Sequence, residues 1–141
     1  MVRKQKTSTA KNISLWLAQG LLALTFLWAG FMKLSKPEAL PFPWISENPS
    51  LVLSTGMVDV LAGIGIFFPA LLRVQPKLTI YAAYGIILLM ASAIVFHLSR
   101  GEAKDIGFNI FVALLAAFIA WGRHARAPVE LKKDKQTKSR P

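Results

Sequence analysis

One carboxylate, Asp59, lies near the middle of a long apolar stretch, Leu51–Leu72. The stretch is long enough to cross a bilayer, because a hydrocarbon layer of roughly 30 Å needs about 20 residues at about 1.5 Å each. An ionisable side chain inside such a segment is costly, and it is kept where it has a function or a partner. Asp59 is therefore either an ion-pairing group that fixes helix packing or a carboxylate that binds a proton or a ligand.

Four other polar residues, Lys33, His97, Asn109 and Gln19, lie in or at the ends of further apolar stretches. In an arrangement of four antiparallel helices, Lys33 ends the first helix, His97 ends the third and Asn109 begins the fourth. All three then reach the membrane half that contains Asp59, and we predict a polar pocket there. Gln19 shares a helical stripe with Lys33 at steps of three and four residues.

Each of these residues also has a simpler interpretation. The long side chain of Lys33 can extend to the headgroups without meeting Asp59. Asn109 is well placed to cap its helix, and His97 lies close enough to water to be an ordinary interfacial group. His124 falls in the C-terminal tail, away from this set.

The composition excludes several kinds of chemistry. The chain has no cysteine, which rules out disulfides, thiolate metal sites and thiol redox chemistry within it. One histidine beside one aspartate is too small a ligand set, so we predict no metal site. Neither a glycine-rich phosphate loop nor a serine nucleophile motif occurs, so we predict no catalytic residues. An enzyme acting alone is the least favoured class.

The sequence predicts an all-α, integral membrane four-helix bundle, since 54% of the residues are hydrophobic. The expected helices cover residues 13–34, 51–72, 78–98 and 106–122. Four prolines between residues 35 and 50 prevent a continuous helix and indicate a loop on the membrane surface. Residues 1–12 form a basic head and residues 123–141 a disordered basic tail. The first helix is expected to be retained, with a cleaved signal peptide as the alternative.

Small residues share a helical face with the polar ones, which lets membrane helices approach closely and by itself indicates packing. The predicted interior stripes are Gln19, Ala23, Phe26, Gly30 and Lys33 on the first helix, Gly56, Asp59 and Gly63 on the second, Met90, Ala93 and His97 on the third, and Asn109, Ala113, Ala116 and Ala120 on the fourth.

The basic residues are distributed unequally between the two sides of the membrane. The net charge is +10, and 13 of the 17 Lys and Arg residues lie in the head, the tail or the short turn between the second and third helices. The positive-inside rule then places both termini in the cytoplasm. Because no basic patch is interleaved with aromatic residues, we predict no nucleic-acid binding. The lipid bilayer is the expected partner of the basic ends.

Several short motifs resemble the DoxX-like family of small membrane proteins. They are AGFMKL (Ala29–Leu34), the pattern G-x-x-D-x-x-x-G (Gly56–Gly63) followed by Pro69, ASAIVFHLSRGE (Ala91–Glu102), Asn109, and the exit Trp121-Gly122-Arg123. The resemblance extends from about Leu15 to Arg123. The family usually has glutamate where this chain has Asp59, which keeps the charge and shortens its reach.

The resemblance implies a four-helix bundle in the bacterial cytoplasmic (inner) membrane. Relatives called DoxD and DoxA form a thiosulfate:quinone oxidoreductase, and some DoxX proteins associate with oxidative-stress enzymes. We therefore expect a non-catalytic membrane subunit or scaffold for a redox or stress-response partner, with quinone or lipid as the candidate ligand at the polar pocket. The alternative is a small proton-coupled transporter that uses Asp59, for which a homo-oligomer would supply further helices.

Overall fold

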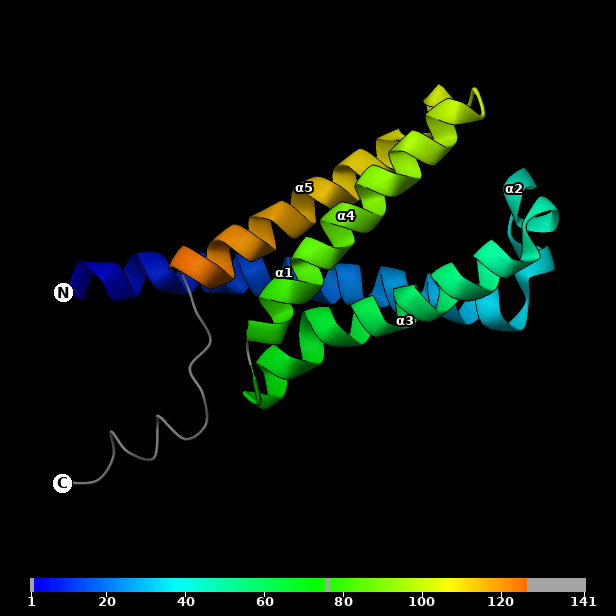
Figure 1. Cartoon of the computed structure of the whole chain (residues 1–141). Coiled ribbons are helices and arrows are strands. Elements are labelled where there is room, and N and C mark those ends of the chain that lie inside the picture. The colour runs from blue at the N-terminus through cyan, green and yellow to red at the C-terminus, as the bar shows by residue number, and fades with distance from the viewer. Residues whose placement is uncertain (1, 76, 127–141) are drawn as a thin grey trace.

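The computed structural model describes residues 2–75 and 77–126, and this part of the chain is helical, with no strand. Within these residues the chain forms four long helices and one short helix (Figure 1). Their bounds are α1 Val2–Ser35, α2 Pro43–Glu47, α3 Pro49–Leu72, α4 Lys77–Ser99 and α5 Gly107–Trp121. Short 3-10 turns, η1 Pro37–Ala39 and η2 Ala103–Asp105, lie in the two longer loops, and a π-helical turn, η3 Gly122–Arg126, follows α5.

The four long helices are those expected to cross a membrane. The apolar spans run over Thr9–Ser35, Pro49–Leu72, Lys77–Ser99 and Ala103–His124, each long and apolar enough for the purpose. Their outward sides carry large apolar side chains exposed on the protein surface, such as Leu17, Leu24, Leu61, Leu88 and Leu114. Such sides are stable only against lipid, because in water they would form a large apolar surface. The prediction of an all-α membrane protein with four spanning helices is confirmed.

The helices form two antiparallel hairpins, α1 with α3 and α4 with α5 (Figure 1). One end of the molecule carries α2 and the α4–α5 loop, and we call it the loop end. The other, where α5 finishes beside α1, is the terminal end. The two hairpins lie close together at the terminal end and diverge toward the loop end.

Glycines set the close approach of α1 and α3. A Cβ added at Gly30 would fall 2.6 Å from Val60 Cγ2 and 2.8 Å from the Gly56 carbonyl oxygen. A Cβ at Gly63 would fall 2.8 Å from Leu27 Cγ. The helix backbones therefore touch where only glycine fits, as small residues allow in membranes.

The interior is apolar along most of its length. Its buried members come from all four long helices: Leu15, Ala18, Leu22, Ala23, Phe26, Ile66, Ala83, Ile86, Met90, Val112, Ala116, Ile119 and Ala120. The predicted stripes face this interior, since most of their residues are buried and the rest, among them Lys33, Ala93, His97 and Ala113, are half-buried.

Three boundaries differ from the expected ones. Helix α1 begins at Val2, so the basic head continues the helix instead of preceding it, because the residues before the span include no proline or glycine to stop it. Prolines at the first positions of η1, α2 and α3 start new helices within the loop, a position where a missing N–H costs nothing. The helical path also continues past residue 122 through η3. The rest of the expected tail, 127–141, lies outside the described residues.

Candidate functional site

The ion pair between Lys33 and Asp59 joins α1 to α3. Lys33 Nζ lies 2.7 Å from Asp59 Oδ2, with side-chain exposures of 16% and 5%. The two stripes predicted from spacing therefore meet, and Asp59 faces the bundle instead of the lipid. A lysine ammonium has three N–H donors, and this bond occupies one of them.

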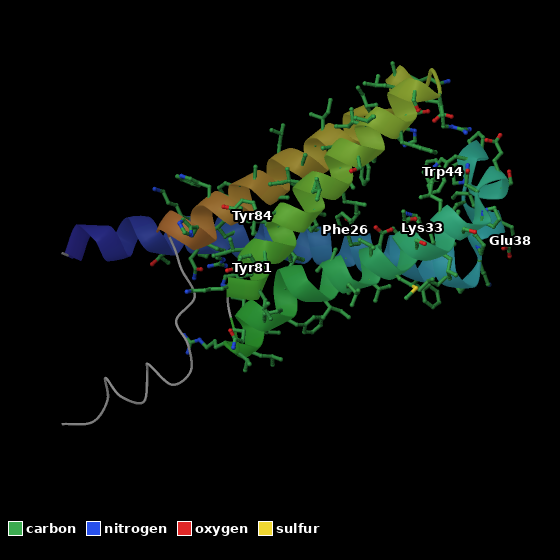
Figure 2. The ribbon with its side chains drawn as sticks, viewed as in Figure 1. Phe26, Lys33, Glu38, Trp44, Tyr81 and Tyr84 are labelled. Carbon is green, nitrogen blue, oxygen red and sulfur yellow. The ribbon has the colours of Figure 1, made fainter. Side chains whose placement is uncertain are left out.

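The ring of Trp44 lies close above the same ammonium. Lys33 Nζ is 5.6 Å from the ring centroid, a distance at which the cation is attracted to the electron-rich face. Trp44 comes from α2, in the loop predicted from prolines. Figure 2 shows Lys33 and Trp44 together toward the loop end, with Phe26 nearer the middle of the bundle.

A pocket of about 250 Å³ opens beside this lysine. Its lining is Lys33, Leu34, Pro37, Ile45, Pro49, Val52 and Leu53, so one cation lies in an otherwise apolar wall. We call it the Lys33 pocket. Ligand pockets are mostly apolar with a few polar groups and usually enclose about 300–1,000 Å³, so this smaller pocket suits a ring or a headgroup more than a whole lipid.

His97 is not part of this pair. Its Nδ1 lies 2.7 Å from Glu102 Oε2, where the ring N–H can donate to the carboxylate. Arg100 Nε donates to the other oxygen of Glu102 at 3.0 Å, and Arg100 Nη2 donates to Glu47 Oε2 at 2.7 Å. The bonds from His97 and then Arg100 lower the pKa of Glu102, while the bonds to Glu47 and then Glu102 raise the pKa of Arg100.

These contacts place His97 in a surface network that links the α4–α5 loop to α2. Asn109 is buried on α5, and among the described residues its side chain forms no hydrogen bond to Asp59 or Lys33. The predicted four-member cluster is therefore reduced to one pair. The predicted topology placed these residues in the same half of the membrane, but it could not show which neighbour each side chain would contact.

Gln19 belongs to a second polar cluster toward the terminal end. It lies 14 residues before Lys33, about 21 Å along the helix, so the two share a face but not a site. Its Nε2 donates to the Ile66 carbonyl at 2.7 Å, and its Oε1 accepts from Arg123 Nε at 2.6 Å. Gln19 therefore lies on the predicted stripe with Lys33, but its own contacts are with Ile66 and Arg123.

Arg123 was expected to lie in the tail, yet it is 3% exposed. It also donates to Asn12 Oδ1, and its guanidinium lies 4.8 Å from the Trp16 ring centroid. A signal for this contact is present in the sequence: a buried glutamine within a span needs a partner, and Arg123 follows the last apolar residues directly. The clusters at Lys33 and at Arg123 are separated by the apolar layer around Phe26.

The described residues contain no group of three or more His, Cys, Asp or Glu side chains that could hold a metal ion. In this pair Asp59 instead holds the Lys33 ammonium in place. The remaining N–H donors of Lys33 can then bind an oxygen acceptor in apolar surroundings. Such a bond is strong there, because the local dielectric is low.

Comparisons with curated proteins and with solved structures gave no significant match. A model of the DoxX-like family matches residues 17–119. The match covers most of the chain, including the Lys33–Asp59 pair and His97, and confirms the resemblance seen in the motifs. This chain, a membrane protein with four spanning helices, belongs to the DoxX-like family.

Proposed function

We propose that this protein is a non-catalytic membrane subunit that binds the oxygen-bearing head of a quinone or lipid in the Lys33 pocket. The observation that carries the proposal is that a partly buried lysine, whose ammonium is paired with Asp59, lines an otherwise apolar pocket. A quinone carbonyl and a lipid ester or phosphate share the chemistry that Lys33 recognises, an oxygen acceptor on an apolar body. The acyl or isoprenoid part would remain in the bilayer.

The family supports the second part of the proposal, that the chain serves a redox or stress-response partner, alone or as a homo-oligomer. The unequal distribution of basic residues supports a bacterial inner membrane location with both termini in the cytoplasm. The Lys33 pocket would then open toward the outer leaflet. Reporter fusions at the C-terminus and in the α1–α3 loop test this orientation directly.

The binding test uses purified protein in nanodiscs of one defined phosphatidylcholine. In the first arm, a short-chain ubiquinone analogue is titrated and its binding is measured by equilibrium dialysis. In the second, lipids that remain bound after delipidation are identified by native mass spectrometry. We expect saturable quinone binding or retention of one lipid class; if neither is found, the proposed ligand chemistry is wrong.

Two matched variants connect binding to the pocket. Leu53 lies at the pocket and is 56% exposed, so Leu53→Trp narrows the pocket without changing the core. Leu61 is 67% exposed on the same helix away from the pocket, and Leu61→Trp is its control. We expect at least a tenfold weaker affinity for the first and wild-type affinity for the second. Equal affinities would show that the ligand binds elsewhere.

The alternative function is proton-coupled transport with Asp59 as the titrating group. The burial of this carboxylate within a membrane span favours it. The apolar layer around Phe26 opposes it, because that layer separates the Lys33 pocket from the polar groups at the terminal end. In proteoliposomes, proton-driven flux in the wild type that Asp59→Asn abolishes would select transport over simple binding.

A further inference from the structure

Helix α2 lies at the loop end, where it is tied to the opposite hairpin. Glu47 Oε2 accepts a hydrogen bond from Arg100 Nη2 at 2.7 Å. The ring of Trp44 contacts that of Phe96 edge-on, with centroids 5.9 Å apart. These contacts cross from the α1–α3 hairpin to the α4–α5 hairpin at the end where the hairpins diverge.

The same short helix forms part of the Lys33 pocket. Ile45 is buried and lines the pocket, and Trp44 lies over the Lys33 ammonium. Successive residues of α2 therefore contact the pocket and the neighbouring hairpin. A movement of α2 away from α4 would withdraw Ile45 and Trp44 from Lys33 together.

The attachments of α2 are of a kind that can break and reform. Residues 40–42 before it are not helical, and Asn48 alone separates it from α3. The side chain of Glu47 is 55% exposed and that of Arg100 is 26% exposed, and ion pairs at such exposure contribute little to stability. Arg100 is in turn held by Glu102, and its guanidinium lies 5.5 Å from the Phe96 ring centroid.

We propose that α2 is a cover over the Lys33 pocket and that Arg100 is the positioning residue that holds it closed. The inference rests on the proposed function for its meaning, because a cover regulates the entry of the ligand. Whether α2 covers the pocket can be measured without any ligand. Closing requires Glu47 to reach Arg100 and Trp44 to reach Phe96, and opening exposes the wall of the pocket.

The test uses the absence of cysteine from the chain. Val52 lines the pocket and is 3% exposed, so Val52→Cys places a single thiol beneath the cover. The rate of its reaction with a small neutral maleimide is measured in full-length protein in nanodiscs. We expect Glu47→Gln and Arg100→Gln each to increase that rate by a factor of about 1.4 to 5, the range that corresponds to loss of an exposed ion pair.

The matched control is Lys104→Gln, which removes a positive charge from the same loop. Lys104 is exposed and forms no ion pair with any other described residue. Its labelling rate should equal that of the parent protein. Because Glu47 is mostly exposed, Glu47→Gln leaves folding intact, and it tests the cover even where Arg100→Gln reduces expression. Equal rates in Glu47→Gln and Lys104→Gln would overturn the proposal.

The two proposals fail in different ways. Faster labelling in Glu47→Gln, without quinone or lipid binding in the wild type, keeps the cover and rejects the ligand. Binding in the wild type with labelling rates that do not depend on Glu47 keeps the ligand and rejects the cover. When both hold, the quinone analogue should associate and dissociate faster in Glu47→Gln, with a smaller change in its affinity.

Discussion

The ion pair between Lys33 and Asp59 should respond unequally to loss of its two members. Lys33→Met leaves the Asp59 carboxylate inside the bundle, where its side chain is 5% exposed. Asp59→Asn leaves an ammonium whose side chain is 16% exposed on a flexible stem at the end of α1. The lysine can extend toward the headgroups, but the short aspartate cannot follow it to water. Lys33→Met should therefore be the more destabilising change.

The size of the difference follows from the cost of an unpaired charge. Breaking a buried pair by removing one partner costs about 3–5 kcal/mol. An aspartate can avoid part of this cost by taking up a proton, which at pH 7 costs about 4 kcal/mol for an ordinary carboxyl. We expect Lys33→Met to reduce the free energy of unfolding by about 3–4 kcal/mol. Asp59→Asn should reduce it by about 1–2 kcal/mol, since Lys33 regains its hydration.

The assay is unfolding by sodium dodecyl sulfate in mixed micelles, monitored by circular dichroism. Lys36→Met is the control, because Lys36 is exposed just beyond α1 and forms no ion pair with a described residue. The double variant Lys33→Met/Asp59→Asn should be more stable than Lys33→Met alone, because no unpaired charge remains. The reasoning is refuted if Asp59→Asn costs as much as Lys33→Met, or if the two single effects simply add.

Three further results are expected. Gly30→Ala should destabilise the fold by about 1–3 kcal/mol in the same unfolding assay, because the new Cβ meets backbone atoms of α3. Gly20→Ala is the control, since a Cβ there has nothing within 4 Å, and it should be neutral or slightly stabilising. Gln19→Leu should cost about 1.5–3 kcal/mol, because the buried Arg123 loses a charged hydrogen bond, and a thermal shift in detergent measures it. His97 and Arg100 lower the pKa of Glu102. The stability that these bonds contribute is therefore complete above the ordinary carboxyl pKa and is lost as the pH falls through the lowered pKa. Because maleimide reacts with the thiolate, the labelling rate of Val52→Cys is divided at each pH by that of a free thiol. This ratio should rise only in strong acid, and a rise of the ratio as the pH falls through the neutral range would contradict this assignment.

Much of the fold could be predicted from the sequence because the bilayer restricts the choice. Four apolar stretches of sufficient length must be helices, and their polar residues must face inward. Spacing alone therefore placed Lys33 and Asp59 on facing stripes, within reach of each other. The close contact at Gly30 also followed, since small residues on such stripes permit it.

The contacts of His97, α2 and Arg123 could not be predicted in this way, because residue spacing does not show which partner a polar side chain contacts. From the sequence, His97 was expected in the same half of the membrane as Asp59. In the structure it pairs with Glu102, which lies five residues further along the chain. The prolines that argued against a helix in the loop also provide good first positions for short ones, which is how α2 arises. Arg123 was predicted to lie in the basic tail because its two sequence signals, Gln19 within the first span and its own position directly after an apolar segment, do not show that the two side chains meet.

The two polar clusters also differ in when they can form during synthesis. The pair of Lys33 and Asp59 joins residues 26 positions apart, whereas the bond from Arg123 to Gln19 spans 104 positions. At about 5–20 residues per second, the first can close roughly 1–5 seconds after its lysine is made, and the second only after about 5–20 seconds. The α1–α3 hairpin with its pocket can thus be complete before Arg123, the later partner of Gln19, has been synthesised. The contacts around the Lys33 pocket can therefore form first, and the contact of the buried Arg123 forms last.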